Sequence, residues 1–113
     1  MLFSRSKSLT PTDAAAAMTQ GELQLIDVRE AGEVAEARVK GARHMPLGRL
    51  STRLGELDRD RPVAFLCRSG SRSAIAARAA TKAGLDAANV KGGVIAWQRA
   101  GLPSDVRGRT ATR

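Results

Sequence analysis

The 113-residue sequence has little of what usually marks redox or metal sites, since it holds one cysteine and one histidine. A single cysteine excludes an internal disulfide, so nothing indicates an oxidising compartment. One cysteine and one histidine also cannot complete the tetrahedral ligand set of a structural zinc site. We therefore expect no metal and no cofactor. Aromatic residues make up only 3%, so the core must be built from Leu, Val, Ile, Ala and Met.

Long apolar runs are also missing. No run approaches the roughly 20 residues that span a bilayer, and the first residues, MLFSRSKSLTP, lack the apolar region of a secretory signal. We expect a cytoplasmic protein with no membrane partner. The content of 42% hydrophobic and 27% charged residues is typical of a globular chain. We expect one domain over residues 1–113, with its core at about 8–103 and a flexible basic tail at 104–113.

The charge of the chain is strongly positive, with a formal net charge of +8. A basic face is the electrostatic footprint of nucleic-acid binding. Here, however, the basic residues are spread along the chain and are not interleaved with aromatic residues that could stack on bases. We therefore consider nucleic acid an unlikely partner and expect the excess charge to attract small anions.

Short apolar runs alternate along the chain with segments of helical character, and no hairpin turn joins two strands. This order predicts an α/β fold with a parallel sheet and helices on both faces. Local signals support it: Thr10 can cap a helix, Pro11 suits its first position and Asp13 its first turn. The pattern predicts helices at 11–20, 30–38, 47–57, 72–83 and 94–100, and strands at 22–28, 41–47, 63–67 and 87–93.

Two of these helices have a face that the spacing defines. Leucines at 47, 50, 54 and 57 mark one face of the helix expected at 47–57. In the helix at 72–83 the expected buried side is almost all alanine, so this helix must pack close to the sheet. The residues that we expect on that side are Ile75, Ala76, Ala79, Ala80 and Ala83.

The single cysteine, Cys67, ends an apolar strand and is followed by the loop RSGSR and then a helix. In open α/β sheets the binding crevice lies beyond the carboxyl ends of the strands, which is where Cys67 falls. A free thiol has a pKa of about 8.5, and only the thiolate is a good nucleophile. The helix start, loop amides curled around Gly70, and the charges of Arg68 and Arg72 would all favour the thiolate.

Taken alone, a lone cysteine at a strand end is more often a small buried apolar residue, but the polar, glycine-bearing loop favours a functional thiol. Spacing by itself does not separate sulfur transfer from phosphoester or arsenate chemistry, because each uses a thiolate in a cradle of amides.

Four segments, in order, resemble the single-domain rhodanese family of thiosulfate sulfurtransferases. They are LIDVRE at 25–30, GARHMPL at 41–47, FLCRSGSRS at 65–73 and GGVIAWQRAGLP at 92–103, and together they span about residues 8–103. The sequence departs from the family before the second segment, where ARVKGA replaces the usual GHIPGA. The resemblance implies a rhodanese-like, mostly parallel five-stranded sheet with helices on both faces.

The resemblance also implies an activity. Cys67 would accept a sulfane sulfur from thiosulfate or another small anionic donor as a persulfide, and pass it to cyanide, a small thiol or a protein thiol. The substrate-binding residues would be Arg68, Ser69, Gly70, Ser71 and Arg72. The loop from Cys67 to Arg72 has six residues, one fewer than in the related phosphatases and arsenate reductases, which favours sulfur. The alternative is a rhodanese-like module, non-catalytic or a carrier, that binds a partner protein.

Other residues draw attention but have structural interpretations. Asp27 and Arg29 match the family's DVR segment, and we expect an ion pair or a loop anchor. His44 invites a role as general base, which attack by a preformed thiolate does not need, so we interpret it as structural. Trp97 is expected in the core, and the glycine pair at 92–93 is expected to let the backbone turn close to the active loop.

Overall fold

The computed structural model describes residues 8–107 and 109–110. A five-stranded sheet crosses the molecule in the order β1-β6-β5-β2-β4, and every neighbouring pair in it is parallel. Its strands are β1 (Ser8–Leu9), β2 (Gln24–Asp27), β4 (Arg43–His44), β5 (Val63–Leu66) and β6 (Ala87–Val90). The expected α/β class and the five-stranded parallel sheet are confirmed.

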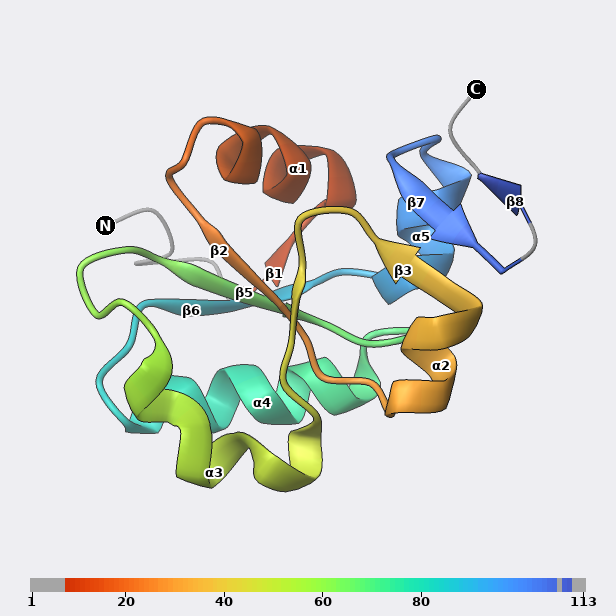
Figure 1. Ribbon diagram of the computed structural model, residues 1–113. Helices are drawn as coiled ribbons and strands as arrows, with labels where there is room; N and C mark the ends of the chain where they lie inside the picture. The colour runs from red at the N-terminus through yellow and green to blue at the C-terminus, as the bar shows by residue number, and fades with distance from the viewer. Residues whose placement is uncertain (1–7, 108, 111–113) are drawn as a thin grey trace.

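Helices cover both faces of this sheet (Figure 1). On one face lie α1 (Pro11–Thr19) and α5 (Gly93–Arg99), and on the other lie α3 (Leu50–Arg53) and α4 (Ser71–Lys82). Side chains alternate between the two faces along each strand. Ile26 therefore packs in the cluster that contains Leu50 and Ala76, whereas its neighbour Leu25 packs in the cluster that contains Trp97. Two apolar layers hold the sheet in place and leave its carboxyl edge for polar groups.

The first helix begins as the sequence predicts. The N–H of Asp13 donates to Oγ1 of Thr10 at 3.1 Å, and Pro11 occupies the first turn of α1. Such a cap satisfies a helix N–H that has no partner within the helix. The next helix, α2 (Ala31–Glu36), is shorter than expected, because the chain turns into a strand at Ala37 instead of continuing to Arg38.

The leucine-rich segment keeps its face but is not one helix. It forms the 3-10 turn η1 (Leu47–Arg49), the short helix α3 and the 3-10 turn η2 (Leu54–Glu56). Each 3-10 turn contains a glycine, Gly48 or Gly55, and glycine is unfavourable inside an α-helix. The leucines still face the core: Leu50 and Leu57 are buried, and Leu47 and Leu54 pack against them.

The expected buried face of α4 is partly wrong. Ile75 is 48% exposed, and Ala79 and Ala83 are exposed as well. The buried residues are Ser73, Ala76, Ala77 and Ala80, which follow the i, i+3, i+4, i+7 spacing of one helix face. Five of the twelve residues of α4 are alanine, and its one large apolar side chain, Ile75, does not set its rotation; the helix turns Ser73 toward the sulfur of Cys67 instead.

A second, three-stranded sheet corrects two expectations. It consists of β3 (Ala37–Val39), β7 (Ser104–Val106) and β8 (Arg109–Thr110), paired antiparallel in that order. The chain therefore does contain a hairpin, and residues 104–106 and 109–110 of the expected flexible tail form strands. Buried Trp97 donates from Nε1 to the carbonyl of Pro103 at 3.1 Å, which fixes the start of β7. The remainder of the expected tail, residues 108 and 111–113, lies outside the described residues.

Candidate active site at the carboxyl edge of the sheet

Cys67 follows directly after β5, the middle strand of the parallel sheet. All four residues of β5 are buried, and the strand ends at Leu66, one residue earlier than expected. The side chain of Cys67 has 0% exposure. Burial alone is what a small apolar core residue would show. The polar groups that point at its sulfur are not what an apolar core residue requires.

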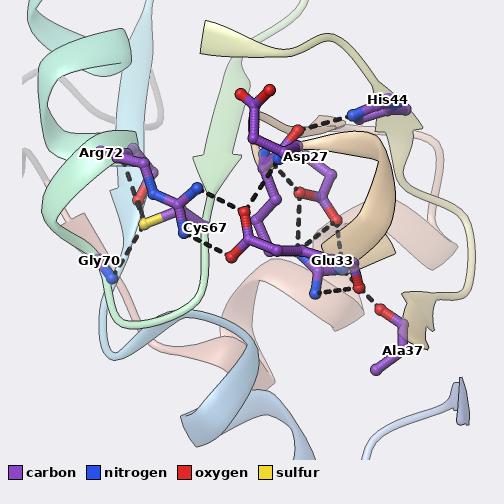
Figure 2. A network of polar contacts seen from close by, with 10 residues as sticks. Asp27, Glu33, Ala37, His44, Cys67, Gly70 and Arg72 are labelled. Carbon is purple, nitrogen blue, oxygen red and sulfur yellow. Dashed lines mark hydrogen bonds and ion pairs between the residues drawn. The ribbon is translucent and has the colours of Figure 1, made fainter. Parts of the chain in front are cut away.

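Three donors converge on the sulfur atom of Cys67. The N–H groups of Gly70 and Ser73 lie 3.2 Å and 3.4 Å from Sγ, and the Ser73 hydroxyl oxygen lies 3.3 Å from it. Figure 2 shows the sulfur facing Gly70 beside Arg72. Burial raises the pKa of the thiol, but hydrogen bonds from Ser73, Gly70 and Ser69 outweigh it, so the pKa of Cys67 lies below its ordinary value. The loop therefore stabilises a thiolate.

The loop keeps this shape through two glycines. Gly70 caps α4 with φ of +112°, a backbone conformation that a side chain would strain. Gly93 has φ of +59°, and a Cβ there would lie 2.3 Å from the carbonyl oxygen of Cys67 and 2.6 Å from that of Arg68. This close approach lets the start of α5 hold the loop, because the N–H of Val94 donates to the Cys67 carbonyl at 2.8 Å. The expectation for the glycine pair is confirmed at Gly93.

The expected substrate-binding residues differ in their surroundings. Arg68, Ser69 and Ser71 are exposed, whereas Gly70 in the same loop is buried. Within the described residues, the Arg68 guanidinium makes no ion pair or hydrogen bond. Arg72 is half-buried and forms two hydrogen bonds to Glu33, from Nη1 to Oε1 at 2.6 Å and from Nη2 to Oε2 at 2.8 Å. The two arginines of the loop are thus not equivalent.

The Glu33–Arg72 pair links α2 to the loop (Figure 2). The hydrogen bonds from Arg72 are the main reason that the pKa of Glu33 is lowered to about 2, and they raise the pKa of the Arg72 guanidinium in turn. The carboxylate is also fixed from its own helix, because Oε1 accepts the N–H of Glu30 at 3.0 Å. A two-point contact of this kind fixes both position and orientation of the guanidinium.

Asp27 and Arg29 form a buried ion pair, as expected, with a distance of 2.7 Å and exposures of 2% and 4%. Arg29 also donates to the carbonyls of Glu33 and Ala37, at 3.2 Å and 2.6 Å. His44 lies with Nε2 at 2.7 Å from the carbonyl oxygen of Arg29. These contacts tie the turn after β2 to α2 and β3, which supports structural roles for all three residues.

Sequence reasoning missed two contributors and undervalued a third. Glu33 and Asn89 are absent from the expected site, and Ser73 enters it only as the last residue of the segment at 65–73. Glu33 lies 39 positions from its partner Arg72, and Asn89 lies 16 positions from Ser73, with which it shares a hydrogen bond. The available signal was topological, since the carboxyl ends of β2, β5 and β6 meet at one edge of a parallel sheet.

The part of the chain that the structure describes holds no group of three or more His, Cys, Asp or Glu residues that could bind a metal ion. Over the same residues, no helix has the length and apolar character needed to cross a membrane.

The fold and this site define an α/β protein with a cysteine held in a cradle of donors after a central strand. The model of the rhodanese-like domain matches residues 10–100, and the chain belongs to the rhodanese family. It is 42% identical over 77 residues to "Putative sulfurtransferase YtwF" of Bacillus subtilis, covering 68% of this chain and 75% of that protein.

A second relative and a solved structure agree. The chain is 36% identical over 83 residues to "Sulfurtransferase" of Allochromatium vinosum, covering 73% of this chain and 78% of that one. The crystal structure of a rhodanese-related protein from Thermoplasma volcanium superposes with a TM-score of 0.80 at 28% identity, over 87% of this chain and 96% of that chain. The family and the names of these relatives support a role in sulfur transfer.

Proposed function

We propose that the protein is a sulfurtransferase in which Cys67 carries the sulfur. The observation that supports this most strongly is the set of three donors aimed at Sγ, from the amides of Gly70 and Ser73 and the hydroxyl of Ser73. An apolar structural cysteine would not need them. A thiolate does, because burial without hydrogen bonds disfavours a charged group.

The reaction that we propose has two displacements. The Cys67 thiolate attacks the sulfane sulfur of thiosulfate or a similar donor; the new S–S bond forms as the old one breaks, and sulfite leaves with the bonding electron pair. The persulfide anion on Cys67 then gives its outer sulfur to a nucleophile, and the Cys67 thiolate is the leaving group. Both charge and atoms balance in each step, and no oxidant or reductant is required.

Arg68 is the better placed of the two arginines to attract an anionic donor, because its charge is exposed and unpaired within the described part of the chain. Arg72 is held by Glu33, so in our proposal it shapes the loop and contributes less to binding. Ser69, Gly70 and Ser71 would border the outer sulfur with their backbone. The net charge of +8 adds a general attraction for anions.

The acceptor must come from outside the chain, since the sequence contains no second cysteine that could resolve the persulfide as a disulfide. Cyanide, a small thiol or a protein thiol would serve. We further propose that residues 1–113 form one rhodanese-like domain and that it works in the cytoplasm, where small thiols are abundant and reduced.

The test is thiocyanate formation from thiosulfate and cyanide by the wild-type protein beside Cys67→Ser. We expect turnover by the wild type and none by the variant, with no hydrolysis of an aryl phosphate by either protein. A wild-type protein that is folded yet forms no thiocyanate would contradict the proposal and favour a binding module.

A further inference from the structure

The Ser73 hydroxyl lies between two acceptors, and it has only one proton to donate. Its oxygen is 2.5 Å from Oδ1 of Asn89 and 3.3 Å from Sγ of Cys67. By distance the contact to Asn89 is the stronger one, because 2.5 Å is at the short end of O–H···O hydrogen bonds. The Ser73 hydroxyl can therefore donate either to Oδ1 of Asn89, which lies in β6, or to the sulfur, but not fully to both.

The side-chain amide of Asn89 cannot turn to relieve this competition. Its Nδ2 donates to the carbonyl oxygen of Gly70 at 3.1 Å, so a rotated amide would place two oxygens against each other. Asn89 thus fixes the loop by donating from its nitrogen to Gly70, and its oxygen accepts from Ser73. When the Ser73 hydroxyl donates its hydrogen bond to Oδ1 of Asn89, its oxygen presents a lone pair to Cys67. A lone pair can accept from a thiol S–H but repels a thiolate.

We propose that Asn89 is a positioning residue that competes with Cys67 for the Ser73 proton and so sets how readily the thiol ionises. In the neutral state the chain of hydrogen bonds runs from S–H of Cys67 to Ser73 and from Ser73 to Asn89. On ionisation the S–H bond breaks, the proton leaves to water, and the Ser73 O–H turns to the thiolate. Oδ1 of Asn89 then gives up its bond from Ser73.

The same turn of the Ser73 hydroxyl bears on sulfur release, a consequence that depends on the proposed function. When an acceptor takes the outer sulfur, Cys67 leaves as a thiolate and again needs the hydrogen bond from the Ser73 hydroxyl. When the thiol is neutral, Ser73 donates that hydrogen bond to Asn89 instead. The competition itself concerns only ionisation, so it can be measured without any sulfur substrate.

Few charged groups face the sulfur. Arg72 of α4 and Glu33 of α2 neutralise each other beside the loop, and Arg68 is exposed. By sequence, β6 (Ala87–Val90) carries no charged residue, and α5 carries one only at its end, Arg99. Changes at Ser73 and Asn89 leave all these charges in place, so a shift in the Cys67 pKa reports on the hydrogen bonds.

The experiment is a double-mutant cycle read by the ultraviolet absorbance of the thiolate against pH, for wild type, Ser73→Ala, Asn89→Ala and the double variant. The chain has one cysteine and no tyrosine, so Cys67→Ser is a clean blank. We expect Asn89→Ala to lower the Cys67 pKa by about half a unit to one unit, the size of one hydrogen bond. We expect Ser73→Ala to raise it by a similar amount. In the Ser73→Ala background the Asn89 change should not lower the pKa, because only the Asn89 contact with Gly70 is then left to lose.

An equal shift from Asn89→Ala in both backgrounds, or no shift in either, would overturn the proposal, because Asn89 would then act through Gly70 alone or not at all. Far-ultraviolet circular dichroism checks that each variant is folded. If Asn89→Ala does not fold, the nearly isosteric Asn89→Asp decides. It should raise the Cys67 pKa more when Ser73 is present than in Ser73→Ala, and an equal rise would overturn the proposal.

Discussion

The ends of β2 and β5 lie side by side at the same edge of the sheet, with Asp27 in register with Leu66. The polar groups at these two ends are arranged differently. At the end of β2, Asp27 and Arg29 form an ion pair and are buried at 2% and 4% exposure. After β5, the amides of Gly70 and Ser73 point at the sulfur of Cys67, a group that needs them fully only when it is charged.

The difference separates structure from chemistry at one edge. A buried ion pair that is also bonded to neighbouring carbonyls holds a turn in place and is closed to a substrate. A cradle of donors around a titratable sulfur changes its interactions with the state of that sulfur. Glu33 joins the two regions, since its carbonyl accepts from Arg29 and its carboxylate holds Arg72.

The largest expected effect comes from the β2 end. Asp27→Asn should cost about 3–5 kcal/mol of unfolding free energy, because it leaves the buried Arg29 charge without its partner. Urea unfolding measures this loss. The Cys67 pKa in the folded protein should change little. A loss under about 1 kcal/mol would mean that the pair does not hold the turn.

At the β5 end, Gly93→Ala should cost about 2–4 kcal/mol, since its Cβ would meet the carbonyl oxygen of Cys67 at 2.3 Å at positive φ. Moving that backbone should also disturb the cradle and raise the Cys67 pKa. Gly101→Ala is the matched control: its φ is +73° but no atom lies within 4 Å of the new Cβ. Equal losses from both variants would contradict a role for close packing behind the loop.

The two arginines of the loop should differ in how much they contribute to binding the sulfur donor. Arg68→Ala should raise the KM for thiosulfate by about fivefold, the size of one exposed charge interaction. Glu33→Gln should lower that KM by a similar factor, because it releases the Arg72 guanidinium. Steady-state kinetics at fixed cyanide measures both. A rise in KM for Glu33→Gln would show that Arg72 works best when held by Glu33.

The smallest effect concerns acid stability. Because the pKa of Glu33 is lowered from 4.5 to about 2 in the folded protein, its pairing with Arg72 stabilises the fold fully above pH 4.5 and is lost as the pH falls toward 2. Both side chains are about one third exposed, so the gain is under about 1 kcal/mol. The stability of wild type relative to Glu33→Gln should therefore shrink across this range. A difference that is constant with pH would contradict the assignment.

Local chemistry made much of the fold predictable. The cap at Thr10, the apolar run before Cys67 and the glycine at 70 each act within a few residues, and the structure confirms the elements that they indicate. The rotation of α4 was not predictable, because alanine contributes too little apolar area to fix a face. The short strands β1 and β3 could not be predicted, because two or three residues carry no periodic signal. They are strands because they pair with β6 and β7.

The site divides in the same way. The position of Cys67 and the curl at Gly70 follow from a strand, a glycine and a helix start in sequence. The pairing of Arg72 with Glu33 and of Ser73 with Asn89 depends on which strands are neighbours, and on rotamers that packing selects. Sequence therefore located the thiol, whereas only the fold shows which side chains are available around it.

The most direct test of the account is the mass of the Cys67 peptide after the protein is mixed with thiosulfate and the excess is removed. We predict a gain of one sulfur atom on that peptide, lost again on addition of cyanide and absent in Cys67→Ser. No gain on the folded wild-type protein, or a gain that persists in Cys67→Ser, would contradict the claim that this thiol carries the transferred sulfur.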